Sequence, residues 1–161
     1  MYEKDEVNLL NSGRIFLGDL FNQSQLTRNY SINVPNILKE SASIRVVAAH
    51  TSFSSAYMEI TVDNVVLANS KLGARPSNDF VATKTTIKKD FIPSKADEIK
   101  LKLTYSNPTS TAYLDFFTIN YKRKLQKSKT EYLLFRNIDN VGVMGNFTFK
   151  LSNTKANVQI W

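Results

Sequence analysis

The residues best suited to chemistry are the only histidine of the chain and the hydroxyl side chains that follow it. His50 ends a run of alternating residues and is followed by Thr51 and Ser52, so a base beside a nucleophilic hydroxyl can be drawn. The Gly-x-Ser-x-Gly turn that often holds such a nucleophile is absent, and a polar residue at a strand end is usually solvated. The sequence therefore predicts no catalytic role for His50.

The carboxylates are scattered along the chain, and no two of them are spaced for paired acid–base work. The candidates are Asp19, Glu59, Asp63, Asp79, Asp90, Asp97, Glu98, Asp115 and Asp139. Asp115 differs from the others because it lies between Leu114 and Phe116 in an apolar run, where a charge needs a partner. We expect Asp115 to be a buried partner of an arginine or of backbone N–H groups.

Thiol chemistry is excluded and metal ligands are few. The chain has no cysteine and one histidine, so it carries no cysteine nucleophile, disulfide or Cys-ligated zinc. Oxygens of Asn137, Asp139 and Asn140 could hold a structural calcium ion, but the spaced loop of an EF-hand is absent. We expect no cofactor, with a structural calcium ion at this loop as the alternative.

Positive charge is concentrated in residues 121–131. The formal net charge of the chain is +7, and this segment holds several basic residues against one acid, Glu131. The basic residues are Lys122, Arg123, Lys124, Lys127 and Lys129. Aromatic residues do not alternate with these bases and no nucleic-acid motif is present, so nucleic acid is not an expected partner. We expect a solvated turn, with an anionic glycan, lipopolysaccharide phosphate or a partner protein as alternative ligands.

Aromatic side chains could form a platform on which a sugar ring stacks. The candidates for this glycan-stacking role are Tyr57, Tyr113, Tyr132 and Trp161. The role requires that these rings be coplanar and exposed, which the sequence does not determine.

Alternating apolar and polar residues predict strands over most of the chain. The predicted strands cover residues 26–34, 43–48, 58–62, 65–68, 80–91, 99–105, 111–121, 132–136, 147–151 and 158–161. The pair Asp63-Asn64 predicts a hairpin turn, and the lysines of residues 80–91 indicate a protected edge strand. Residues 111–121 are expected to form a central strand. Its apolar residues change from one face of the strand to the other, which indicates either a β-bulge or a strand that is covered on both faces.

The strand spacing predicts an all-β protein, an antiparallel β-sandwich of jelly-roll-like type. A length of 161 residues fits a single domain over residues 1–161 with its own core. Apolar runs long enough to span a bilayer are absent, so no transmembrane segment is expected. The first twenty residues carry acids where a secretory signal needs a basic start and an apolar centre.

Four segments carry a family resemblance. They are YLDFFTINYKRKL, LLFRN, VGVMGNFTFKLSNTKANVQIW and the earlier RIFLGDLFNQSQLTRNYSINVPNI. Together they resemble the β-sandwich that precedes the peptidase domain in PorU-type sortases of the type IX secretion system, which are gingipain-like cysteine peptidases. The earlier segment is similar to the start of that sandwich, where a Gly-acid pair precedes an aromatic residue and a strand ending in proline.

The resemblance implies a function for a longer parent protein. Such proteins cleave peptides with a His/Cys pair in the downstream domain, and a chain without cysteine supplies no such pair. The implied parent is exported to the outer membrane and cell surface of Bacteroidota, processes the C-terminal domains of secreted cargo and links them to anionic lipopolysaccharide. The expected partners are the downstream peptidase domain, secretion-system proteins, cargo C-terminal domains and lipopolysaccharide.

For residues 1–161 the resemblance implies a non-catalytic accessory or interaction domain that lies upstream of a peptidase domain. The strand pattern and the supply of tyrosine leave one alternative, a free-standing carbohydrate-binding module of jelly-roll type.

Overall fold

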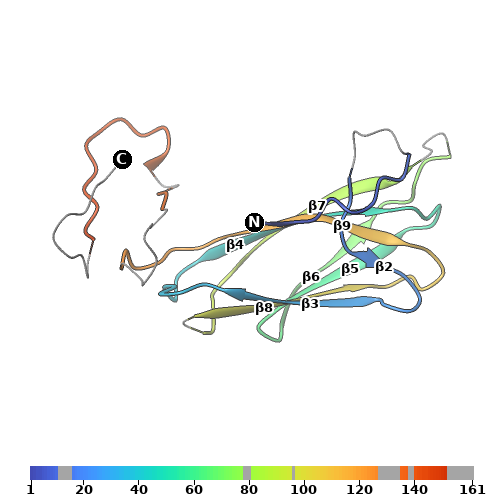
Figure 1. Cartoon of the computed structure of the whole chain (residues 1–161), viewed down its shortest axis with the longest axis horizontal. Coiled ribbons are helices and arrows are strands. Elements are labelled where there is room, and N and C mark those ends of the chain that lie inside the picture. The colour runs from blue at the N-terminus through green and yellow to red at the C-terminus, as the bar shows by residue number, and fades with distance from the viewer. Residues whose placement is uncertain (11–15, 78–80, 96, 127–134, 138–139, 152–161) are drawn as a thin grey trace. The chain divides into compact units, whose positions relative to one another are not determined.

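The computed structural model describes residues 1–10, 16–77, 81–95, 97–126, 135–137 and 140–151. The chain divides into two units, Met1–Lys122 and Arg123–Trp161, and the strands of the described residues all belong to the first. In this first unit two antiparallel sheets pack together (Figure 1), which confirms the predicted all-β sandwich class. A single domain over residues 1–161 stays a prediction. The described residues include no helix with the length and apolar content of a membrane span.

The two sheets use strands from distant parts of the chain. The first sheet has the order β1-β9-β4-β7, with β2 also paired to β9. Its strands are β1 (Tyr2–Glu3), β2 (Leu20–Phe21), β4 (Ala42–His50), β7 (Thr83–Phe91) and β9 (Ala112–Asn120). The second sheet has the order β3-β8-β5-β6. Its strands are β3 (Thr27–Asn33), β5 (Ala56–Val62), β6 (Val65–Leu72) and β8 (Glu98–Tyr105). The central position of β9 and the edge position of β7 were both predicted and are confirmed.

The core lies between the sheets and follows the alternation of the sequence. In β8, Ile99, Leu101 and Leu103 are almost completely buried, while Lys100 faces solvent. Because successive side chains of a strand point to opposite faces, this register sends every second residue into the core. Each fully buried large aliphatic side chain contributes about 1.5–3 kcal/mol to folding, so the alternation determines which face of the sheet is covered.

A β-bulge at Asp115 explains why apolar residues change face within β9. The consecutive β4 residues Val47 and Ala48 lie opposite Phe116 and Leu114, so Asp115 is the extra residue on its strand. A bulge advances the side-chain alternation by one position. Buried apolar residues therefore precede and follow the bulge on the same face.

The β5–β6 turn is confirmed at Asp63 and Asn64, which have left-handed φ angles of 49° and 69°. Two consecutive residues at positive φ give the tight hairpin turn that suits the twist of paired strands. The Asp63 carboxylate accepts hydrogen bonds from the backbone N–H of Lys100 at 2.9 Å and from the hydroxyl of Ser94 at 2.7 Å. Burial would raise the pKa of Asp63, but these hydrogen bonds outweigh burial and hold the pKa below its ordinary value.

Removal of the Asp63 carboxylate is expected to destabilise the sandwich. Asp63→Ala should lower the free energy of unfolding by about 1–3 kcal/mol, because the backbone N–H of Lys100 loses its acceptor. Urea denaturation at neutral pH measures this effect. The matched control is Asp90→Ala on the exposed edge strand β7, and equal stability of the two variants would contradict the prediction.

The prediction of a strand at residues 147–151 is wrong. Phe147, Phe149 and Leu151 alternate with polar residues, but these residues form no ladder with another described segment. Alternation makes a strand only where a partner strand supplies hydrogen bonds. Instead the ring of Phe149 packs against that of Phe135, with centroids 5.1 Å apart. The predicted strand at 158–161 and most of the one at 132–136 lie outside the described residues.

Candidate functional site

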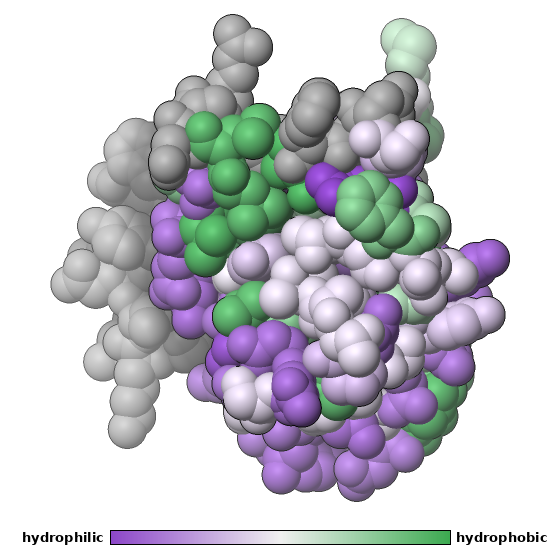
Figure 2. Space-filling view, turned by 90° about the vertical axis from the view of Figure 1, so that its right-hand side faces the viewer, coloured by the Kyte–Doolittle hydropathy of each residue, from purple (hydrophilic) through white to green (hydrophobic). Residues whose placement is uncertain are grey.

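Four connections meet at one end of the sandwich, which lies on the right in Figure 1: β2–β3, β4–β5, β6–β7 and β8–β9. We call this the loop end. Hydrogen bonds join its connections directly, from the backbone N–H of Arg75 to the carbonyl of Ser52 at 2.8 Å and from that of Thr51 to the carbonyl of Thr111 at 3.1 Å. The view onto this end shows weakly polar residues over much of its centre, bordered by hydrophilic and hydrophobic groups (Figure 2).

A chain of buried polar groups runs from the core to the loop end. His50 is fully buried, so the expectation that it would be solvated is wrong. The strand that carries His50 continues under the loops, which cover the imidazole. Its Nε2 lies 2.6 Å from the carbonyl of Gly73 and its Nδ1 lies 3.3 Å from the hydroxyl of Tyr105. The Tyr105 hydroxyl in turn lies 2.7 Å from that of Ser110.

His50 is not arranged as a base for the hydroxyl groups beside it in sequence. The Thr51 hydroxyl bonds the hydroxyl and the carbonyl of Thr111, at 2.8 and 3.2 Å. The Ser52 hydroxyl accepts a hydrogen bond from the backbone N–H of Ser54 at 3.0 Å. The imidazole is engaged elsewhere, so the structure does not bring together the nucleophile and base that the sequence allowed.

The buried end of this chain determines one hydrogen-bond direction. The carbonyl of Gly73 can only accept, so Nε2 of His50 donates to it. The Tyr105 hydroxyl lies between Nδ1 of His50 and the hydroxyl of Ser110. Burial raises the pKa of Tyr105, with a smaller opposing effect of Ser110, so the hydroxyl keeps its proton. Whichever of the two hydroxyls donates to the other, the oxygen of Ser110 keeps a lone pair for a further hydrogen bond.

An open depression with a volume of about 420 Å³ lies at the loop end, between the β2–β3 and β8–β9 connections. It is lined by Asn22, Gln23, Ser24, Pro108, Thr109, Ser110 and Thr111. Charged side chains are absent from this described lining. Asn22 shapes one wall, because its Oδ1 accepts hydrogen bonds from the backbone N–H of Ser24 and of Gln25, each at 3.1 Å.

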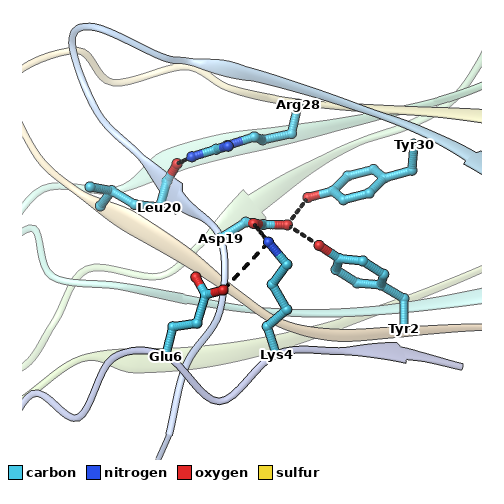
Figure 3. A network of polar contacts seen from close by, with 7 residues as sticks. All are labelled: Tyr2, Lys4, Glu6, Asp19, Leu20, Arg28 and Tyr30. Atoms are coloured by element: carbon cyan, nitrogen blue, oxygen red, sulfur yellow. Dashed lines mark hydrogen bonds and ion pairs between the residues drawn. The ribbon is translucent and has the colours of Figure 1, made fainter.

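A second polar cluster lies around Asp19, between β1 at the edge of the first sheet and β3 at the edge of the second (Figure 3). The Asp19 carboxylate is 6% exposed; its Oδ2 accepts hydrogen bonds from the hydroxyls of Tyr2 at 2.7 Å and Tyr30 at 2.9 Å. Lys4 donates to Oδ1 at 3.0 Å. Tyr2 belongs to one sheet and Tyr30 to the other, so a single carboxylate joins the two sheets at this side. We call this group the Asp19 clamp.

The Asp19 clamp shifts the pKa values of its members in opposite directions. Burial would raise the pKa of Asp19, but hydrogen bonds from Tyr2, Lys4 and Tyr30 outweigh it and hold the pKa below its usual value. Burial, followed by the hydrogen bond to Asp19, raises the pKa of Tyr2 and of Tyr30. The hydrogen bond to Asp19 raises the pKa of Lys4. The clamp is therefore a stable charged pair with neutral tyrosines and offers no group that titrates near neutral pH.

Gly18 lets the Asp19 clamp lie against the bulge of β9. The backbone N–H of Gly18 donates to the carbonyl of Leu114 at 2.7 Å, and that of Leu114 donates to the carbonyl of Asp19 at 2.9 Å. A Cβ on Gly18 would lie 2.9 Å from the carbonyl oxygen of Lys4 and 3.2 Å from that of Leu114. The Gly-acid pair and the YLDFF segment, which carry much of the family resemblance, are thus bonded to each other.

A side chain at position 18 is expected to separate these backbones. Gly18→Ala should lower the free energy of unfolding by about 1–3 kcal/mol, because the two close atoms belong to the backbone and cannot turn away. Chemical denaturation measures the effect. Gly73→Ala is the matched control, since a Cβ at Gly73 meets nothing within 4 Å. If both alanines cost the same, the close approach is not what requires glycine.

The predicted basic patch is only partly within the described residues. Lys122 ends the first unit, and its Nζ lies 3.9 Å from a carboxylate oxygen of Glu40. Arg123 and Lys124 belong to the second unit. The two remaining members, Lys127 and Lys129, lie outside the described residues.

The structure does not bring the candidate stacking tyrosines together. Tyr57 lies on β5 beside buried Met58 and is 44% exposed, whereas Tyr113 lies on β9 of the other sheet between two buried residues. Both rings therefore face away from the core, on opposite outer faces of the sandwich. Tyr132 and Trp161 lie outside the described residues, and a stacking role for any one of these rings stays a prediction.

Two further expectations concern single acids. Asp115 does have a partner, but it is Lys84 of the edge strand β7, on the far side of β4, rather than an arginine, with Nζ 2.7 Å from Oδ2. In the proposed calcium loop Asp139 lies outside the described residues, while the backbone N–H of Asn140 donates to the carbonyl of Asn137 at 3.4 Å. The described residues contain no group of three or more acids or histidines that could hold a metal ion.

Sequence reasoning missed the Asp19 clamp and the buried chain of His50. The signal for Asp19 was its position directly before Leu20 and Phe21, which is close to the argument that singled out Asp115. Its partners lie 17 residues away at Tyr2 and 11 residues away at Tyr30, and local spacing does not reveal such pairs.

The fold places the first unit among antiparallel β-sandwich domains of jelly-roll type. No known family profile matches the chain, and no curated protein sequence matches it. Among solved structures, dimeric latent PorU from Porphyromonas gingivalis is similar with a TM-score of 0.69 and 17% identity over 79% of this chain. The match spans only 13% of the PorU chain.

Carbohydrate-binding modules also match, with lower TM-scores. The CBM36-1 domain of a xylanase from the hindgut metagenome of Trinervitermes trinervoides has a TM-score of 0.48 and 11% identity over 74% of this chain and 86% of its own. A family 35 carbohydrate-binding module from an environmental isolate has a TM-score of 0.49 and 14% identity over 73% of this chain and 82% of its own.

Proposed function

We propose that the chain is a non-catalytic accessory domain of a cell-surface, gingipain-like cysteine peptidase of the type IX secretion sortase kind. The observation that carries the proposal is the fold similarity to PorU over 79% of the chain. Two of the segments that carry the sequence resemblance, at Gly18-Asp19 and at Leu114, are hydrogen-bonded to each other in this fold. The parent protein would be exported to the outer membrane and would process secreted cargo.

The proposal of a non-catalytic role rests on the side chains that peptide cleavage would require. A cysteine peptidase needs a thiolate, and the sequence contains no cysteine. The one histidine is fully buried and bonded to Gly73 and Tyr105. The hydrolytic pair would therefore come from a downstream domain, on which this sandwich would pack or beside which it would dock cargo and secretion-system proteins.

The sequence that follows Trp161 in the parent gene tests the proposal. We expect it to encode a peptidase domain with a His/Cys pair, and we expect that domain to bind residues 1–161 in a pull-down with purified proteins. The isolated chain should not hydrolyse peptide substrates. A different downstream domain, or peptide hydrolysis by residues 1–161 alone, would overturn the proposal.

We further propose that the basic segment at residues 122–129 binds anionic lipopolysaccharide or an anionic glycan weakly. Replacing Lys122, Lys124 and Lys127 with glutamine should weaken binding to lipopolysaccharide vesicles about tenfold or more, because each lysine near an anionic surface adds to the attraction. Binding by the unchanged chain should fall as salt rises. Vesicle co-sedimentation at two salt concentrations measures both effects.

The control for this experiment has the same change in charge elsewhere. Lys71, Lys88 and Lys100 are exposed on strands of the sandwich, and their glutamine variant should bind lipopolysaccharide nearly as well as the unchanged chain. Equal loss in the two triple variants would mean that net charge alone drives binding.

A further inference from the structure

The depression at the loop end receives the outer end of the buried polar chain. Ser110 lines it, and its hydroxyl lies 2.7 Å from that of Tyr105. The oxygen of Ser110 keeps at least one lone pair whichever of the two hydroxyls donates, so it can accept a hydrogen bond from a group in the depression. The contact with buried Tyr105 holds this acceptor in place.

The opposite wall supplies donors. Asn22 uses its Oδ1 to accept hydrogen bonds from the backbone N–H and the hydroxyl of Ser24 and from the backbone N–H of Gln25. This turn fixes the amide of Asn22, whose Nδ2 group remains available as a donor. Gln23, exposed beside it, adds an amide that can both donate and accept.

The composition of the lining selects the class of ligand. One wall offers an acceptor at Ser110 and the other a donor at Asn22, and none of the described lining side chains is charged. Each hydroxyl of a sugar donates one hydrogen bond and accepts others, which matches such a surface. An anion would need a cation in the lining, which the described lining residues do not supply, whereas the apolar part of the lining can contact the C–H face of a sugar ring.

The walls of the depression are held in place before any ligand arrives. The Thr111 hydroxyl lies 2.8 Å from that of Thr51, and Thr109 donates its backbone N–H and its hydroxyl to Oδ1 of Asn107 at 3.0 and 2.8 Å. Groups that are already ordered lose less conformational entropy when a ligand binds.

We propose that the depression between residues 22–24 and 108–111 binds a neutral, hydroxyl-rich carbohydrate, with Ser110 as acceptor and Asn22 as donor. This site is distinct from the outer-face tyrosines that the sequence suggested for glycan stacking. It goes beyond the accessory role proposed above, and either statement can fail without the other.

The experiment titrates the complete 161-residue chain with four neutral oligosaccharides: cellohexaose, xylohexaose, mannohexaose and maltohexaose. Isothermal titration measures affinity, and backbone amide shifts locate the site. We expect at least one sugar to bind and to shift amides of residues 22–24 and 108–111. Ser110→Ala and Asn22→Asp should each weaken that binding about tenfold. The aspartate keeps the Oδ1 acceptor of the turn, replaces the donor with a second acceptor and adds one negative charge, and the Asn69→Asp control makes the same change in charge.

The control variants make similar changes outside the depression. Ser31→Ala loses a hydroxyl that bonds Glu98 at 2.6 Å, and Asn69→Asp alters an exposed residue of β6; neither should change the affinity. The proposal is overturned if none of the four sugars binds or if the shifts map to Tyr57 or Tyr113. It is also overturned if polygalacturonate or an extended peptide binds the same amides more tightly than every neutral sugar.

Discussion

Asp19→Ala is expected to lower the free energy of unfolding by about 3–5 kcal/mol, among the largest effects of any single substitution in the sandwich. The carboxylate is almost completely buried and accepts hydrogen bonds from Tyr2, Tyr30 and Lys4. Alanine leaves two tyrosine hydroxyls and an ammonium group without their acceptor and opens a gap between the two sheets. Urea denaturation at pH 7 measures the loss.

The same carboxylate should make stability depend on pH in the acid range. The folded-state pKa of Asp19 is lowered, so its contribution is fully present above the unfolded-state pKa of about 3.9 and is lost as pH falls through the folded-state pKa. The pKa values of Tyr2 and Tyr30 are raised, so their contribution is present below about pH 10 and is lost as pH rises through their folded-state values. Stability should therefore be highest between these limits.

Asp19→Asn is the control for charge. It keeps one acceptor and the approximate volume, so it should cost less than alanine at pH 7 and should remove part of the decline in stability between about pH 5 and 2. The interpretation of the Asp19 clamp fails if Asp19→Ala is as stable as the unchanged chain. It also fails if the acid decline is the same with aspartate, asparagine and alanine.

His50→Ala is expected to lower the free energy of unfolding by about 2–4 kcal/mol. The substitution opens a cavity beneath the loop end and leaves the carbonyl of Gly73 without its donor. Tyr105 keeps its contact with Ser110, so part of the buried chain survives. Thermal and urea denaturation of the variant check the prediction, and a loss below about 0.5 kcal/mol would contradict it.

A double-mutant cycle separates the cavity from the hydrogen bond. Tyr105→Phe removes only the hydroxyl that links His50 to Ser110. If the hydrogen bond between His50 and Tyr105 contributes to stability, the loss in free energy of unfolding of the double variant should be about 0.5–1.5 kcal/mol smaller than the sum of the two single losses. Additive losses would show that the two residues contribute through packing alone.

The sequence predicted most of the sandwich because its strands carry their own signal. Alternation located β3, β4, β5, β8 and β9, and the pair Asp63-Asn64 located a turn that needs two residues at positive φ. The lysines of β7 predicted an edge strand. A phase change in the apolar pattern indicated either a bulge or two covered faces, and the structure has a bulge at Asp115.

The features that sequence reasoning missed depend on contacts between distant segments. The strands β1 and β2 have two residues each, too few for any periodicity, and they exist because β9 offers them an edge. His50 was expected at the surface because it ends its strand. The loops that cover it come from residues far along the chain, which the local sequence pattern does not reveal. The strand expected at 147–151 failed for the opposite reason, since its alternation has no partner strand among the described residues.

The pairing of β1 with β9 joins the two ends of the first unit, Tyr2 to Phe117, and so affects the order of folding. A chain that leaves a ribosome or a translocon with its N-terminus first exposes Tyr2 and Asp19 long before Phe117 and Leu114 are available. Contacts of such long sequence separation form late and slow the folding of β-sandwiches. Until then Asp19 lacks the strand that it is anchored to, and the two sheets lack their shared carboxylate clamp. A chain interrupted before β9 would thus keep an open sheet edge, which other chains can pair with.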